Sequence, residues 1–155
     1  MVITIDHITV VVSNLNRSEK FYTEILGFSV IGRAHLEGNW LNESMNMDNV
    51  IGDVIYLRSK ELGTRLELLK FTSPDEIMLD ETSLPNAIGI RHIAFRVEDI
   101  DSLVEKLKKS DVEFVGKCIE VPNELETGGA GNKRMCYFHD PDGVLLELTQ
   151  FTSEA

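Results

Sequence analysis

The chain has 155 residues, of which 43% are hydrophobic and 26% charged, and its formal net charge is −11 at pH 7. That length predicts one domain able to bury roughly two thirds of its unfolded surface. No segment approaches the roughly 20 apolar residues of a membrane span, and the negative charge disfavours binding to a phosphate backbone. We therefore expect a small-molecule partner and neither nucleic acid nor membrane.

The two cysteines, Cys118 and Cys136, are too few and too far apart in the chain to indicate a disulfide framework. The first residues carry no basic leader, so we expect a cytoplasmic, reducing compartment. Cys136 sits in an apolar run, Met135 to Phe138, and is expected to be a buried packing residue rather than a nucleophile.

The first half of the chain opens on a β-branched run that is typical of a strand, followed by Ser13 and Asn14, which favour the start of a helix. Gly27 is expected to end that helix. The expected elements are a strand at 7–12, a helix at 15–26 and strands at 28–37, 50–58 and 65–71.

The second half repeats this pattern. Glu98 and Asp99 provide the helix cap, and the apolar spacing that follows predicts a helix over 100–107. Strands are expected at 91–97, 112–117, 134–138 and 144–150. The repeat predicts an α+β fold of tandem βαβββ modules, with module one at 1–72, a linker at 73–88 and module two at 89–155.

Two polar stretches fall outside these elements. Residues 120–133 contain the run Gly128-Gly129-Ala130-Gly131 and are expected to form either a flap beside a site or an exposed hairpin loop. Residues 39–49, with Trp40, are expected to be a loop that either lines a substrate pocket or only packs on the domain, with loop packing favoured.

Each module-opening strand carries a histidine on the face opposite its apolar side chains. Ile8, Val10 and Val12 alternate with His7, and Ile93 alternates with His92. A single histidine on a strand is more often a hydrogen-bonded structural residue. The same placement in both modules favours a shared role.

Glu67 and Glu147 each lie between two leucines near the last strand of their module. A carboxylate among apolar neighbours is costly unless it is paired or bound to a metal. Each glutamate follows its histidine by a similar interval, 60 residues in the first module and 55 in the second. Two imidazoles and two carboxylates would suit one Zn²⁺, Ni²⁺, Co²⁺, Fe²⁺ or Mn²⁺ ion.

Several stretches resemble the vicinal oxygen chelate superfamily, which includes glyoxalase I, methylmalonyl-CoA epimerase, extradiol dioxygenases and bleomycin-resistance proteins. They are Asp6-His7-Ile8-Thr9-Val10-Val11-Val12, Arg91-His92-Ile93-Ala94-Phe95, and Phe138-His139-Asp140-Pro141-Asp142-Gly143 leading to Leu146-Glu147-Leu148. The resemblance implies paired modules that form an open, cup-like mixed β-sheet barrel with helices outside, and usually a homodimer. It also implies His7, Glu67, His92 and Glu147 as ligands of one divalent metal.

The resemblance further implies an isomerase, lyase or epimerase that stabilises a metal-bound enediolate or enolate, with Glu147 and Glu67 as the proton-moving candidates. Val11 stands where glyoxalase I places an arginine that contacts glutathione, which argues against glutathione. An extradiol-type dioxygenase and a non-catalytic antibiotic-binding protein are the alternatives. The candidate substrate contacts are Arg33, Trp40, Arg65, Arg96, Arg134 and Tyr137.

Overall fold

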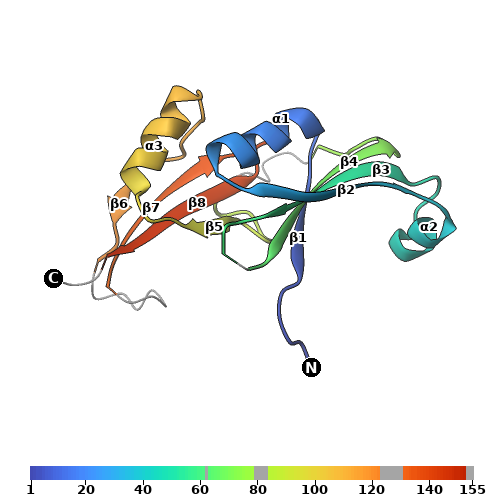
Figure 1. Ribbon diagram of the computed structural model, residues 1–155, viewed down its shortest axis with the longest axis horizontal. Coiled ribbons are helices and arrows are strands. Elements are labelled where there is room, and N and C mark those ends of the chain that lie inside the picture. The colour runs from blue at the N-terminus through green and yellow to red at the C-terminus, as the bar shows by residue number, and fades with distance from the viewer. Residues whose placement is uncertain (62, 79–83, 123–130, 153–155) are drawn as a thin grey trace. The chain divides into compact units, whose positions relative to one another are not determined.

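The computed structural model describes residues 1–61, 63–78, 84–122 and 131–152, and the chain forms two compact units, Met1–Met78 and Leu79–Ala155 (Figure 1). Unit 1 contains β1 (His7–Val11), α1 (Leu15–Lys20), a π-helical turn (Phe21–Ile25), β2 (Ser29–Glu37), α2 (Asn39–Met45), β3 (Ile51–Arg58) and β4 (Arg65–Ser73). Unit 2 contains β5 (Ile93–Arg96), α3 (Ile100–Lys109), β6 (Ile119–Glu120), β7 (Asn132–His139) and β8 (Leu145–Thr152).

The two units have the same sheet topology. Each is an open four-stranded sheet, in the order β1-β4-β3-β2 in unit 1 and β5-β8-β7-β6 in unit 2. In each sheet the first strand pairs in parallel with the last, and the remaining pairs are antiparallel. The α+β class and the repeated βαβββ order expected from the sequence are confirmed.

One helix packs on each sheet, α1 against β4 and α3 against β8 (Figure 1). Both helices begin at the expected caps, since the Asn14 side chain accepts a hydrogen bond from the Arg17 backbone N–H and Asp99 accepts one from Ser102. The first helix ends in the π-helical turn and then at Gly27, whose φ of 81° suits a residue without a β-carbon.

The core of each unit lies between the helix and the sheet face that it covers. In unit 1, Val10, Val12 and Leu68 are almost completely buried, while His7 and Thr9 on the alternate positions of β1 are exposed. In unit 2 the side chains of Phe138, Leu146 and Leu148 are fully buried. Because strand side chains alternate between faces, burial of the apolar set leaves the opposite face for polar residues.

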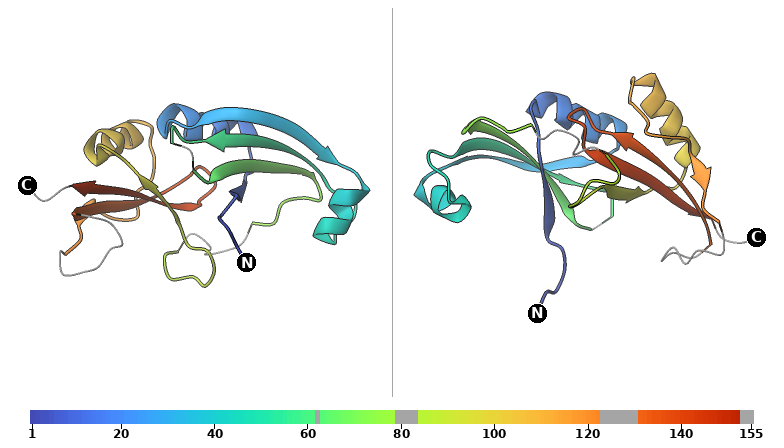
Figure 2. Two further views of the ribbon diagram at one scale, coloured as in Figure 1. Left: turned by 60° about the horizontal axis from the view of Figure 1, so that its bottom comes forward. Right: turned by 180° about the vertical axis from the view of Figure 1, so that it is seen from behind.

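Two local expectations were wrong. Residues 39–45 form the helix α2 rather than a loop, and α2 lies at the end of β2 remote from α1 (Figure 2). The stretch 112–117 is not a continuous strand: Phe114 makes an isolated bridge to Phe138, and the short strand β6 forms the edge of the sheet beside β7 instead. Gly116, which favours irregular backbone, interrupts this segment.

Part of the expected linker, residues 79–83, and most of the glycine-rich stretch, residues 123–130, lie outside the described residues. Among the residues that the structure describes, no helix is long and apolar enough to cross a membrane.

Candidate metal centre

Unit 1 brings His7 and Glu67 together on the sheet face that does not carry α1. The Nε2 atom of His7 lies 3.8 Å from Oε2 of Glu67, and the Thr9 hydroxyl donates to the same oxygen at 3.3 Å. The register explains this approach, since β1 and β4 are parallel neighbours that pair Thr9 with Glu67. The Glu67 side chain is 15% exposed.

Asp6 fixes the orientation of the His7 ring. Its Oδ1 atom lies 2.8 Å from Nδ1 of His7 and also contacts the Arg65 guanidinium. These two hydrogen bonds, that of His7 first, hold the pKa of Asp6 below its usual value. An Nδ1–H that donates to a carboxylate leaves Nε2 as the unprotonated nitrogen, which is the form of histidine that binds a metal.

Unit 2 brings His92 and Glu147 together in the same way. Nε2 of His92 lies 3.1 Å from Oε2 of Glu147, whose side chain is only 3% exposed. The second carboxylate oxygen, Oε1, lies 2.9 Å from Nζ of Lys133. The Tyr137 ring packs edge-on against the His92 ring, with 5.2 Å between centroids. Burial and the adjacent Glu147 charge raise the pKa of Tyr137.

The two clusters occupy equivalent places in the two sheets. Thr9 pairs with Glu67 and Ala94 pairs with Glu147, and the histidine stands two residues before the paired residue in each case. On the other side of each glutamate the register places a tyrosine, Tyr56 opposite Glu67 and Tyr137 opposite Glu147. The sequence repeat therefore places the histidine, glutamate and tyrosine of each unit at equivalent positions in its sheet.

The equivalence fails at one position that matters for charge. Phe71 and Phe151 each follow the glutamate of their unit by four residues. Phe151 on β8 pairs with Lys133 on β7, whereas Phe71 on β4 pairs with Gly52 on β3. A β-carbon on Gly52 would lie 2.8 Å from the Lys70 carbonyl oxygen, so this position excludes any side chain. Glu147 makes a direct ion pair with an ammonium group, whereas Glu67 accepts from a neutral hydroxyl and feels the Arg65 guanidinium, which is bound to Asp6, only as a nearby charge.

The donor atoms fit a divalent ion. Two donors about 2.1 Å from one ion and at tetrahedral or octahedral angles are separated by roughly 3.0 to 3.4 Å. The distance in unit 2 lies in that range and the distance in unit 1 is slightly longer. Within neither unit do three or more His, Cys, Asp or Glu side chains of the described residues gather in a metal-holding group. Each unit thus brings together two candidate metal ligands.

The same face of β8 carries two buried polar atoms without a hydrogen-bond partner among the described residues, Oε1 of Glu147 and Oγ1 of Thr149. The Lys133 ammonium is close to the first of these, but its contact is an ion pair without hydrogen-bond geometry. Native proteins seldom leave such atoms unpaired, and unpaired polar atoms of this kind are often found at functional sites.

Some predicted substrate contacts lie near these clusters. Arg65 contacts Asp6 beside His7, and Tyr137 contacts His92. Arg96 stands over the Phe151 ring at 5.1 Å from its centroid. A substrate role for these residues stays a prediction.

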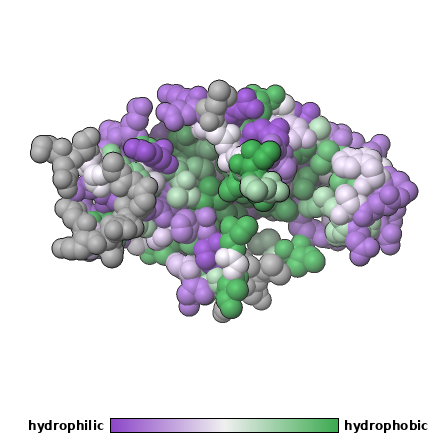
Figure 3. Space-filling model, turned by 90° about the horizontal axis from the view of Figure 1, so that it is seen from below, coloured by the Kyte–Doolittle hydropathy of each residue, from purple (hydrophilic) through white to green (hydrophobic). Residues whose placement is uncertain are grey.

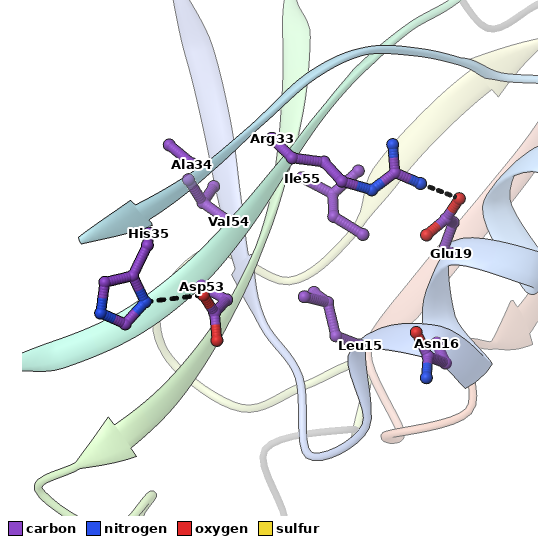
Figure 4. A pocket seen from close by; sticks show the side chains of 9 residues that line it. All are labelled: Leu15, Asn16, Glu19, Arg33, Ala34, His35, Asp53, Val54 and Ile55. Atoms are coloured by element: carbon purple, nitrogen blue, oxygen red, sulfur yellow. Dashed lines mark hydrogen bonds and ion pairs between the residues drawn. The ribbon is translucent and has the colours of Figure 1, made fainter.

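Other predicted contacts face away from the clusters or lie at the surface. Arg33 lines a pocket of about 370 Å³ between α1 and the β2–β3 edge, where its guanidinium binds Glu19 at 2.5 Å (Figure 4). Arg134 makes two hydrogen bonds to Asp101 of α3, at 2.7 and 2.8 Å. Trp40, on α2, is 61% exposed. These positions leave their substrate roles as predictions too.

Lys133 and Thr9 were absent from the candidates chosen from the sequence. Lys133 lies in a polar segment and Thr9 on a strand rich in β-branched residues, so neither stands out by type. The sequence does contain a signal for a different neighbour of each glutamate, a repeated tyrosine. Tyr56 precedes Glu67 by 11 residues and Tyr137 precedes Glu147 by 10.

The chain belongs to the Glyoxalase/Bleomycin resistance protein/Dioxygenase superfamily, whose family model matches residues 4–148. It is 33% identical over 144 residues to the uncharacterized protein YaeR of Escherichia coli, covering 93% of each chain. It is 26% identical to the human mitochondrial methylmalonyl-CoA epimerase, covering 94% of this chain and 73% of the epimerase.

A solved structure with the same fold is the glyoxalase family protein APC24694 from Bacillus cereus. Its TM-score is 0.85 at 28% identity, and the match covers 97% of this chain and 95% of that chain.

Replacing Lys133 with Met is expected to destabilise the metal-free protein by about 3 kcal/mol, because a nearly buried carboxylate would lose its cation. Urea unfolding in the presence of a chelator measures this. Adding Glu147→Gln to Lys133→Met should recover part of the loss, since the double variant buries no unpaired charge. If Lys133→Met and wild type unfold alike, the ion pair has no energetic role.

Proposed function

We propose that the protein is a divalent-metal-dependent lyase, isomerase or epimerase in which His7, Glu67, His92 and Glu147 ligate one cation. The observation that carries the proposal is the repeated histidine–glutamate pair, with nitrogen-to-oxygen distances of 3.8 and 3.1 Å at equivalent register positions. Two neutral imidazoles and two carboxylates balance the charge of a divalent ion. This donor set accepts Zn²⁺, Ni²⁺, Co²⁺, Fe²⁺ or Mn²⁺.

A bound cation would polarise neighbouring substrate oxygens and lower the pKa of an adjacent C–H. The chain must then supply a group that moves the proton, and the two glutamates differ in their freedom to do so. Glu147 is buried and has Lys133 at one oxygen and His92 at the other. Glu67 is more exposed, and its hydrogen-bond donor is a neutral hydroxyl while the nearby Arg65 guanidinium is bound to Asp6, so Glu67 changes partner at lower cost. Glu67 is therefore the stronger candidate for the proton carrier.

The superfamily match and the similarity to an epimerase support this reaction class. An extradiol-type dioxygenase is the second candidate, and the observation in its favour is Tyr137, which contacts both His92 and Glu147. Four protein ligands leave fewer open positions for oxygen than the two-histidine, one-carboxylate set of non-haem iron oxygenases. The presence of both histidine–glutamate pairs argues against a binding protein without catalysis, because the resemblance implies that drug-sequestering members lack the metal ligands. The cytoplasm stays our proposed compartment.

Purified protein is expected to contain about one divalent ion per chain by elemental analysis. His7→Ala and His92→Ala should each weaken binding of added Zn²⁺ or Mn²⁺ at least about tenfold in calorimetry, since each removes one ligand. His35→Ala is the matched control, because His35 belongs to the α1-side pocket with Asp53 as its partner. Unchanged metal binding in both ligand variants would refute the assignment.

The reaction class is tested with hydrogen exchange in deuterated water. We expect the metal-loaded protein to catalyse exchange of the α-proton in 2-oxo hemithioacetals or acyl-CoA thioesters, and Glu67→Gln to slow it at least about a hundredfold, as for loss of a general base. Oxygen consumption with catechols, without such exchange, would replace the proposal with the dioxygenase.

We also propose a homodimer. Large apolar side chains stand exposed close in sequence to the point where the chain passes from unit 1 to unit 2, with Ile77 81%, Ile88 103% and Ile90 86% exposed. Figure 3 displays hydrophobic surface among hydrophilic side chains on one face of the molecule. Exposed apolar surface of this kind often marks a protein contact.

Light scattering coupled to size exclusion is expected to give twice the chain mass of 17.5 kDa. Ile88→Ser should shift the population toward monomer, and Ile31→Ser on β2, 45% exposed, is the control. A wild-type monomer at all concentrations would contradict the dimer.

A further inference from the structure

The two cysteines face each other in unit 2 although 17 residues separate them in the chain. β6 and β7 are antiparallel, with Ile119 paired with Met135 and Glu120 with Arg134. Continuing this register by one position sets Cys118 opposite Cys136. Arg134 shares a face of β7 with Cys136 and has its Nη2 atom 3.8 Å from the Cys118 sulfur, so the two cysteine side chains lie on the same face.

The spacing of such a pair suits a disulfide. Directly opposed residues of antiparallel strands have Cα atoms about 4.5 or 5.5 Å apart. A disulfide spans Cα separations of about 4.4 to 6.8 Å. Both thiols are free in the structure, Cys118 partly exposed and Cys136 2% exposed.

The surroundings make the two thiols unequal. Nη2 of Arg134 lies 3.8 Å from Sγ of Cys118, and two hydrogen bonds to Asp101 hold the guanidinium in place. Cys118 therefore has a fixed cation beside it and is the more accessible sulfur, which makes it the one that an oxidant reaches first. Burial raises the pKa of Cys136 to about 12, so Cys136 is the weaker nucleophile.

We propose that Cys118 and Cys136 form a peroxide-oxidised thiol pair that closes to a disulfide between β6 and β7. In the first step the Cys118 thiolate attacks one oxygen of hydrogen peroxide, the O–O bond breaks, and Cys118 becomes a sulfenic acid as hydroxide leaves and takes up a proton to form water. In the second step the Cys136 sulfur attacks the Cys118 sulfur, the S–O bond breaks, and the thiol proton leaves with the hydroxide as a second water. Peroxide is reduced and the two thiols are oxidised.

The disulfide would join the residue before β6 covalently to β7, the strand that carries Lys133 and Tyr137 beside Glu147 and His92. Arg134 and Cys136 alternate on β7 with Lys133 and Tyr137, so the thiol pair lies on one face of β7 and the neighbours of Glu147 lie on the other. Oxidation would fix the end of β7 from which Lys133 reaches Glu147. A cross-link closing this segment also restricts the unfolded chain and raises stability.

The test treats the full-length protein with hydrogen peroxide, blocks remaining thiols with N-ethylmaleimide and maps peptides by mass spectrometry without reduction. We expect a cross-linked peptide pair containing Cys118 and Cys136 that has lost two hydrogens, a higher thermal midpoint, and reversal of both by dithiothreitol. Cys136→Ser should instead accumulate a sulfenic acid at Cys118 that dimedone traps. Cys118→Ser should keep Cys136 as a thiol, and Arg134→Gln should slow the oxidation of Cys118 several-fold.

Three results would overturn the proposal: a disulfide between chains in place of the internal one, a sulfenic or sulfinic acid at Cys118 in wild type with Cys136 still reduced, or two unreacted thiols. Because Cys118 is partly exposed, Cys118→Ser is expected to fold, and it separates a loss of cross-linking from a loss of structure.

Discussion

A carboxylate buried between leucines is the constraint on which the candidate site depends. Glu147 is 3% exposed on a strand whose neighbours are Leu146 and Leu148, and a charge in that position needs compensation. The structure supplies it from two sides, with the Lys133 ammonium at one oxygen and the His92 imidazole at the other. Because burying a charged group costs free energy, the position of Glu147 favours a functional role for this residue over a purely structural one.

The duplicated architecture explains how a short chain assembles such a site. Each unit repeats the same strand order, so a histidine and a glutamate that recur in the sequence recur at the same register in space. The two copies have diverged in their immediate neighbours. Gly52 cannot carry a side chain, and Lys133 provides a cation at the matching position, so the two glutamates are electrostatically unequal. The repeat thus positions both histidine–glutamate pairs, and the local difference gives the two glutamates different charged neighbours.

The side chains of β7 alternate between the two faces of the sheet, so the neighbours of Glu147 lie on one face and the thiol pair lies on the other. One face carries Lys133 and Tyr137 beside Glu147, and the other carries Arg134 and Cys136. A strand transmits a constraint on one face to the other because its backbone is shared. Regulation through the thiols would therefore need no direct contact with the candidate metal ligands.

Local sequence patterns were enough to predict the two modules and the helix caps at Asn14 and Asp99, because each depends on periodicity or on chemistry within a few residues. The four candidate ligands were chosen from the repeat of a histidine and a glutamate in both modules, and their role as ligands stays a prediction. The ion pair of Lys133 and Glu147 and the approach of Cys118 to Cys136 could not be predicted. Both depend on the register between strands, and shifting that register by one residue would reverse which side chains meet. Periodicity thus established which face each side chain takes, and the pairing of the strands decided which side chains touch.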